Sequence, residues 1–180
     1  MKTIKLLAVL FISTLVFTSC EDDHDDDHDH GSDEELITTV LYTLTDGNNT
    51  IVLEWEDLDG DTGNAPTISS GTLTANTSYT GSIQLLNRTE SPAEDITLEV
   101  RAEGDEHEFF YTNTAGLTIT KTDTDGTNPV GIETSLSTGA AGSGSLTIVL
   151  KHEPTKPNDG TAANAGGSTD VQVTFPISIR

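Results

Sequence analysis

Side chains that bind metal ions are concentrated in one short stretch near the start of the sequence. Residues 21–35 contain ten acidic residues and three histidines, with no lysine or arginine. Imidazole is a good ligand for Zn, Cu and Ni, and interleaved carboxylates add charge and further ligands. So much like charge with so few apolar side chains predicts a disordered segment, which would bind an ion weakly and exchangeably. The candidate ligands are His24, His28, His30, Asp25, Asp27 and Asp29. The competing interpretation is a spacer without a ligand.

A second group of candidate metal ligands lies further along the chain. Glu106-His107-Glu108 and His152-Glu153 each place an imidazole beside carboxylates in or near a predicted strand. If two strands bring His107 and His152 together with Glu106 or Glu108, the result is a site for zinc or copper. Because strand pairing cannot be read from one sequence, ordinary surface histidines are the alternative.

A third candidate is a calcium loop at Asp57, Asp59 and Asp61, where carboxylates alternate around Gly60. Alternating oxygens and a glycine turn can surround a hard cation such as Ca²⁺. An EF-hand would need a glutamate six residues after the glycine, and Pro66 stands there. Asp and Gly are also favoured in β-turns for backbone reasons, so a plain turn is the competing interpretation.

Nothing in the sequence predicts an enzyme. There is no nucleophile elbow, phosphate-binding loop, HExxH or CxxC pattern, and no serine or threonine has a motif that pairs it with a general base. The aromatic run Phe109, Phe110 and Tyr111 is the remaining feature of interest. Neighbouring residues of a strand point to opposite faces, so at least one ring should leave the core. That ring would stack on a sugar or line an interface with a partner.

The first twenty residues predict the cellular location of the protein. Two lysines precede the apolar run Leu6–Phe17, which is too short to span a bilayer and is typical of a secretory signal over residues 1–19. Cys20, the single cysteine, follows Thr18 and Ser19. This boundary resembles the lipobox of bacterial lipoproteins. The resemblance implies lipidation of Cys20, with membrane attachment through acyl chains, and intramolecular disulfides are excluded.

We expect three parts: the signal at 1–19, Cys20 and an acidic tether over 20–35, and one domain over 36–180. The domain carries 20 acidic and 6 basic residues, a formal charge of −14. Nucleic acid is therefore excluded as a partner, because its recognition requires a basic face.

The domain is rich in Thr, Ser, Gly and Asn, which favours strands and turns. Alternating patterns predict an all-β, immunoglobulin-like β-sandwich of about eight or nine strands. The segment Ile96–Tyr111 fits a strand or, through Ser91-Pro92-Ala93-Glu94, a helix start; we favour the strand. The predicted strands are 36–44 and 51–56 as a hairpin, then 71–75, 79–87, 96–111, 117–122, 132–138, 146–152 and 171–179.

A wider resemblance covers nearly the whole chain. The acidic-histidine tract, EDLDGDTGNAP, DEHEFFYT, TGAAGSG, KHEP, NAGGSTD and the closing VTFPISI resemble a group of small Bacteroidota lipoproteins of unassigned function. Some of these carry the label type 1 periplasmic binding fold, which alternates strand and helix and which this sequence does not support.

Glu21-Asp22-Asp23, directly after Cys20, resemble the export signals of Bacteroidota lipoproteins. This resemblance implies a place on the outer membrane, facing the cell exterior. The resemblance to the lipoprotein group further implies an accessory role beside a TonB-dependent receptor. Two functions stay open at this point. One is a binding lipoprotein that captures transition-metal ions, and the other is a structural or adhesive module that binds a glycan or a protein.

Overall fold

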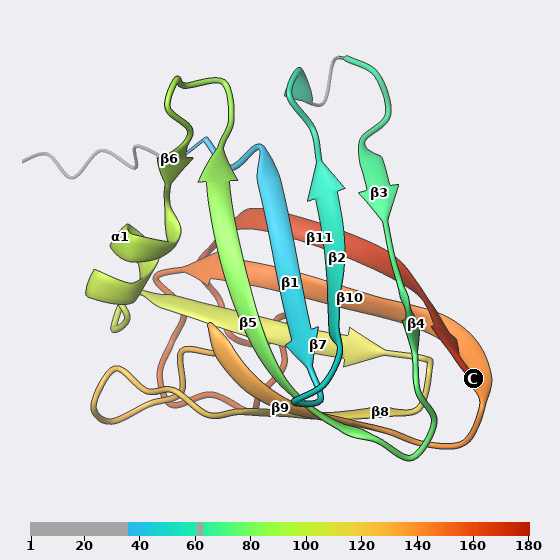
Figure 1. The fold of residues 1–180 in the computed structure, drawn as a ribbon. Helices are drawn as coiled ribbons and strands as arrows, with labels where there is room; N and C mark the ends of the chain where they lie inside the picture. Colours follow the sequence, from blue (N-terminus) through green and yellow to red (C-terminus); the bar gives the residue numbers. More distant parts are fainter. Residues whose placement is uncertain (1–35, 61–62) are drawn as a thin grey trace, which may run out of the picture. The chain divides into compact units, whose positions relative to one another are not determined.

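The computed structural model describes residues 36–60 and 63–180, and this part of the chain is almost entirely β-structure (Figure 1). Its strands form two sheets, and a single turn-and-a-half of helix lies beside them. The elements are β1 Thr39–Thr45, β2 Thr50–Glu56, β3 Thr67–Ser69, β4 Thr72–Leu73, β5 Ser78–Asn87, β6 Glu94–Asp95, α1 Thr97–Ala102, β7 His107–Asn113, β8 Leu117–Lys121, β9 Glu133–Thr138, β10 Gly142–His152 and β11 Ser168–Ile179.

The predicted hairpin is present as β1 and β2. These strands pair antiparallel from Thr45 opposite Thr50 to Thr39 opposite Glu56. The turn between them is organised by Asp46, whose Oδ1 accepts hydrogen bonds from the backbone N–H groups of Asn48 and Asn49 at 2.9 and 2.8 Å. An aspartate that bonds its own following backbone is a common turn device, and the sequence carried that signal.

The first sheet has the order β3-β2-β1-β5-β9-β8, with β6 paired to β5, and the second has the order β4-β11-β10-β7. In Figure 1 the strands β1, β2 and β5 run steeply down the view, and β7, β10 and β11 cross behind them. The predicted all-β sandwich is confirmed. The described residues form eleven strands rather than eight or nine, because short β3 and β6 have no alternating pattern long enough to be recognised.

One apolar core fills the space between the sheets, and both contribute to it through alternate residues. The side chains of its principal members are at most 2 % exposed, and the burial of each one contributes about 2 kcal/mol to stability. The principal members are Tyr42, Leu44, Leu53, Ile83, Leu85 and Leu136 from the first sheet, with Phe109, Leu146, Ile148, Leu150, Val173 and Phe175 from the second.

The strand predicted at the start of Ile96–Tyr111 is wrong, because residues Thr97–Ala102 form the helix α1. A strand would have placed Ile96, Leu98 and Val100 on one face. In the structure Ile96 and Val100 are buried and Leu98 is 68 % exposed, which is the spacing of one helical face. Asp95 supports the helix start by accepting a hydrogen bond from the backbone N–H of Thr97 at 3.1 Å. The second half of the segment is strand β7, as predicted.

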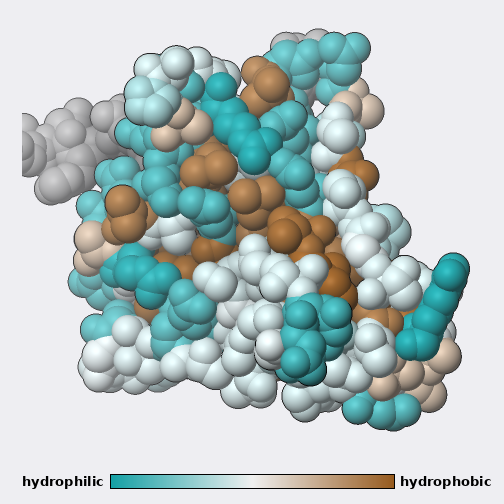
Figure 2. Space-filling model, viewed as in Figure 1, coloured by the Kyte–Doolittle hydropathy of each residue, from teal (hydrophilic) through white to brown (hydrophobic). Residues whose placement is uncertain are grey.

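The outer face of the first sheet is mixed in character. Figure 2 shows apolar patches interrupted by polar ones on the side of the molecule that Figure 1 presents. Val52 on β2 is 42 % exposed there. Nη1 of Arg88 pairs with Glu54 at 2.7 Å and with Glu56, the two outward-facing glutamates of β2. No helix among the described residues is long and apolar enough to cross a membrane.

Candidate ligand-binding groove

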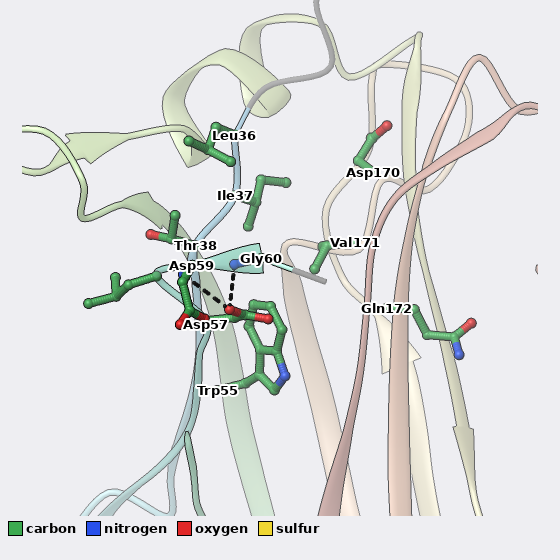
Figure 3. Close-up of a pocket in the computed structure, with 11 residues that line it drawn as sticks. Leu36, Ile37, Thr38, Trp55, Asp57, Asp59, Gly60, Asp170, Val171 and Gln172 are labelled. Atoms are coloured by element: carbon green, nitrogen blue, oxygen red, sulfur yellow. Dashed lines mark hydrogen bonds between the residues drawn. The ribbon is translucent and has the colours of Figure 1, made fainter. Parts of the chain in front are cut away.

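An open groove of about 500 Å³ lies where three segments meet at one end of the sandwich (Figure 3). Its walls come from residues 36–38 before β1, from the end of β2 with the turn after it, and from the start of β11. Residues from both sheets therefore line the groove. Its position is fixed because β1 and β2 are paired through their whole length and β11 is paired with β10.

Trp55 contributes an indole ring to the lining of this groove. It lies in β2 opposite Val40, and its side chain is partly buried against the core. Figure 3 shows its indole beside Asp57, with Val171 of β11 turned towards the same space and Gln172 turned away. Leu58, also in the lining, is 52 % exposed. An aromatic ring with exposed apolar neighbours is a surface on which a flat or ring-shaped ligand can stack.

The carboxylates of the candidate calcium loop line the groove but act as turn acceptors. Oδ1 of Asp57 accepts hydrogen bonds from the backbone N–H of Gly60 at 2.8 Å and of Asp59 at 3.3 Å. Asp59 accepts hydrogen bonds from the backbone and the side chain of Asn64, and these bonds lower the pKa of Asp59. Both arrangements fit the interpretation as a β-turn. Asp61 lies outside the described residues.

The two domain histidines of the second candidate metal site come together across β7 and β10. His107 pairs with His152 in the register of these strands, and their rings are stacked 4.7 Å apart at 12°. His107 is fully buried, and its Nδ1 lies 3.1 Å from the carbonyl oxygen of Glu103. Nε2 of His152 lies 3.8 Å from Glu106. Parallel stacking directs the ring nitrogens sideways rather than at one shared ion.

Sequence reasoning missed a residue of this cluster, Asp170. The pairing of β10 with β11 shifts between Leu150 and Lys151, so Asp170 is the extra residue of a β-bulge. Bulges redirect side chains, and here the carboxylate of Asp170 reaches a site 3.8 Å from Nε2 of His107 and is 2 % exposed. An extra residue in one strand leaves no recognisable signal in an alternating pattern.

Glu108 does not join the histidines. It follows His107 directly in β7, so it points to the opposite face of the sheet. There it pairs with Lys121 and accepts a hydrogen bond from Nδ2 of Asn158 at 2.7 Å. Within residues 36–60 and 63–180, no group of three or more His, Cys, Asp or Glu side chains is arranged to hold a metal ion. The four predicted residues are therefore divided between two places.

The aromatic run in β7 does not provide an exposed ring. Phe109 faces the core, and Phe110, on the outer face, is only 2 % exposed. Phe110 packs in a small second cluster with Val149 and Ala165, the latter from the loop between β10 and β11. The prediction that one of these rings would be free is wrong because this loop covers the outer face of β7 and β10. Trp55 is the ring that lines a groove instead.

The remaining candidate residues lie outside the described residues: Cys20, His24, His28, His30, Asp25, Asp27 and Asp29. Comparison with protein families, with curated proteins and with solved structures found no match for this chain.

Proposed function

We propose that this protein is a non-catalytic binding lipoprotein whose groove at Trp55 takes a glycan. The observation that carries the proposal is the combination, in one groove of about 500 Å³, of an indole surface with carboxylates fixed in a turn. Sugars present an apolar ring face and a rim of hydroxyl groups. An aromatic ring stacks on the face, and carboxylate oxygens accept hydrogen bonds from the hydroxyls.

The negative charge of the domain limits the class of glycan that the groove would bind. The domain carries a formal charge of −14, and Asp57 and Asp59 stand in the groove itself. The lowered pKa of Asp59 keeps that carboxylate charged at neutral pH. An anionic polysaccharide would be repelled by this field, so the proposed ligand is a neutral or amino-bearing sugar chain.

The proposed placement follows from the sequence. A lipid on Cys20 would hold the protein to the outer membrane, and residues 20–35 would act as a tether for the immunoglobulin-like domain. On the cell exterior, such a module would collect a glycan beside a TonB-dependent receptor.

Metal capture is the second proposed function, and the three histidines and the carboxylates of residues 21–30 support it. Carboxylates next to the imidazoles favour the protonated imidazolium, so Zn²⁺ uptake should weaken on mild acidification. Calorimetric titration with Zn²⁺ of the mature chain, with and without residues 21–30, tests this proposal. Equal uptake by both forms would contradict it.

The glycan proposal is tested with the fluorescence of Trp55, because it is the single tryptophan in the sequence and reports on the groove alone. Neutral glucan, mannan and galactan oligosaccharides are titrated into the full chain. We expect a saturable change in emission and protection of Trp55 from acrylamide quenching by at least one of them. Polygalacturonate fragments should produce neither effect.

Variants assign the binding to the groove. Leu58→Ser removes an exposed apolar side chain, and Asp57→Asn removes a charge while keeping an oxygen for the turn. Each should weaken binding roughly tenfold, which corresponds to about 1.4 kcal/mol. Thr118→Ala, on the exposed face of β8, is the matched control and should bind like the wild type. No emission change with any neutral oligosaccharide would overturn the proposal.

A further inference from the structure

One carboxylate in the structure holds an amine and a carboxamide at the same time. Oε1 of Glu108 contacts Nζ of Lys121, and Oε2 of Glu108 accepts a hydrogen bond from Nδ2 of Asn158 at 2.7 Å. Glu108 lies in β7, Lys121 ends β8, and Asn158 belongs to the loop between β10 and β11. Since both oxygens are bonded to one carbon, the amine and the carboxamide are neighbours across that carboxylate.

The acid and the amine of this group are largely shielded from water. The Glu108 side chain is 5 % exposed and the Lys121 side chain is 17 % exposed. Nζ of Lys121 lies 4.5 Å from the centre of the Phe110 ring. A pocket of about 280 Å³ adjoins the three polar residues and is also lined by Thr120, Asn128, Pro129, Pro157 and Gly160. Burial of this kind disfavours the charged form of an amine.

The Lys121 amine is disposed to act as a nucleophile. Burial lowers the pKa of Lys121, although the contact with Glu108 opposes that shift. A lysine amine attacks carbonyl carbons only after it loses its proton, and desolvation is an established way of activating it. Glu108, in contact with Nζ, is placed to receive that proton.

The Asn158 carboxamide is held by hydrogen bonds at both of its polar atoms. Its Oδ1 accepts a hydrogen bond from the backbone N–H of Gly160 at 2.9 Å. A donor at this oxygen stabilises the negative charge that develops when the carbonyl carbon is attacked. Its Nδ2 donates to Thr155 O at 3.0 Å as well as to Glu108. The nitrogen that must leave therefore lies on the same acid that takes the proton from lysine.

We propose that Lys121 and Asn158 join in an intramolecular isopeptide bond, with Glu108 as the proton shuttle. Nζ attacks Cγ of Asn158 and forms a C–N bond, giving a tetrahedral intermediate whose oxygen is held by the N–H of Gly160. Glu108 takes one proton from Nζ before the attack and delivers it to Nδ2, and its carboxylate then takes the second proton from the attacking nitrogen. The Cγ–Nδ2 bond then breaks, and Nδ2 departs as ammonia. An amine and a carboxamide become a secondary amide and ammonia, with no change of oxidation state.

Other lysines and asparagines of the domain lack this arrangement. Lys156 donates to the carbonyl oxygens of Gly104 and His107 and to the carboxylate of Asp125, whose other bonded groups are the backbone N–H groups of Thr127 and Asn128. Lys151 donates to the carbonyl oxygen of Gly167. Asn164 does donate to a carboxylate, that of Asp159, but the other groups bonded to Asp159 there are the N–H and hydroxyl of Thr161. The bond is therefore proposed for one pair alone, which makes its location a sharp test.

Peptide mapping of the purified full chain tests the proposal. Trypsin cuts after Arg101 and Lys151, cannot cut after an acylated Lys121, and cuts poorly between Lys156 and Pro157. The bond predicts a branched product in which peptide 102–151 is joined to peptide 152–180, lighter than their sum by one ammonia. Free peptides 102–121, 122–151 and 152–180 at unshifted masses would overturn the proposal.

Variants distinguish this bond from other losses of ammonia. Glu108→Gln, Lys121→Met and Asn158→Ala should each abolish the branched product, and Asn164→Ala, in the same loop, should retain it. A succinimide at Asn158–Asp159 would also release ammonia, but it would persist in Lys121→Met and would leave no branched peptide. A branched product in Glu108→Gln would overturn the role of Glu108. The wild-type map decides the existence of the bond even if a variant fails to fold.

Discussion

One ion-paired cluster of the domain lies around Arg88 and another lies around Lys121, and their surroundings differ. On the outer face of the first sheet, Arg88 meets Glu54 and Glu56, and all three side chains are between 28 and 35 % exposed. At the end of β8, Lys121 meets Glu108, whose side chain is 5 % exposed. The first cluster remains in contact with water. In the second, Nζ of Lys121 lies over the ring of Phe110, and Glu108 also accepts a hydrogen bond from the Asn158 carboxamide.

The difference shows that burial decides what an ion pair can do. Water screens the exposed cluster, so its attraction adds little to stability and its charges stay on their own groups. In the second cluster, burial lowers the pKa of Lys121, and Glu108 is in contact with the amine. A cation and a carboxylate thus form a screened ion pair in one place and, in our proposal, a reactive centre in the other.

The largest expected effect comes from Asn158→Ala. This change leaves the Lys121–Glu108 pair in place and removes the acyl partner of the proposed bond. A cross-link between residues 121 and 158 restricts the unfolded chain, and its loss should lower the free energy of unfolding by about 4 kcal/mol. Denaturant titration of both proteins measures the difference.

The size of this effect separates two explanations. If Asn158 contributes only its hydrogen bonds, the loss is about 1 kcal/mol. Asn164→Ala, which also removes a carboxamide bonded to a carboxylate in the same loop, sets that smaller scale. Equal losses for the two variants would contradict the cross-link.

Burial should also control the ionisation of groups that are uncharged at neutral pH, and Tyr42 offers a test. Its hydroxyl is 2.7 Å from that of Thr134 in the core, and burial raises the pKa of Tyr42 to about 12. The folded state thus holds its proton more tightly than the unfolded state, whose pKa is near 10. The contribution is complete below pH 10 and is lost as the pH rises towards 12.

A difference of about two units between the folded and unfolded pKa of Tyr42 corresponds to about 2.7 kcal/mol of folding free energy. We expect denaturation midpoints to fall steeply between pH 10 and about pH 12 and less steeply in Tyr42→Phe, which cannot ionise. Tyrosinate absorbance, followed alongside circular dichroism, should appear together with unfolding. Early ionisation of Tyr42 in a folded protein would contradict this account.

The smallest effect is expected at the exposed cluster. Arg88→Met should lower the free energy of unfolding by less than about 1 kcal/mol, and added salt should shrink the difference further. Parallel denaturant titrations at low and high salt measure it. A loss as large as that of Asn158→Ala would remove the contrast between the two clusters.

The sequence predicted those parts of the fold in which one local signal is sufficient. Strands β1 and β2 show regular alternation, and Asp46 with Gly47 marks the turn between them. The helix α1 could not be predicted in this way. The apolar residues Ile96, Leu98 and Val100 fit the alternation of a strand, and Ile96 and Val100 also fit the spacing of a helical face. Only packing against β5 shows that Leu98 lies outside the core.

The sites depended on contacts between distant residues, and these were harder to predict. His107 and His152 were named as a possible pair, and antiparallel pairing of β7 and β10 places them together. Glu108 was grouped with them because it is adjacent in sequence, although adjacency in a strand means opposite faces. Lys121 and Asn158 carry no recognisable motif, and a strand and a long loop bring them to Glu108 from separate parts of the chain.

Strand β11 lies between β4 and β10 and follows both of them in the chain. Its pairing of Ser178 with Thr72 joins segments separated by most of the domain. The second sheet therefore cannot close while β11 is still being synthesised, and long-range pairing of this kind slows folding. A polypeptide bound for export through a membrane must stay unfolded until it has crossed. In the proposed export of this chain, the late position of β11 would leave time for secretion machinery to engage it before the sandwich assembles.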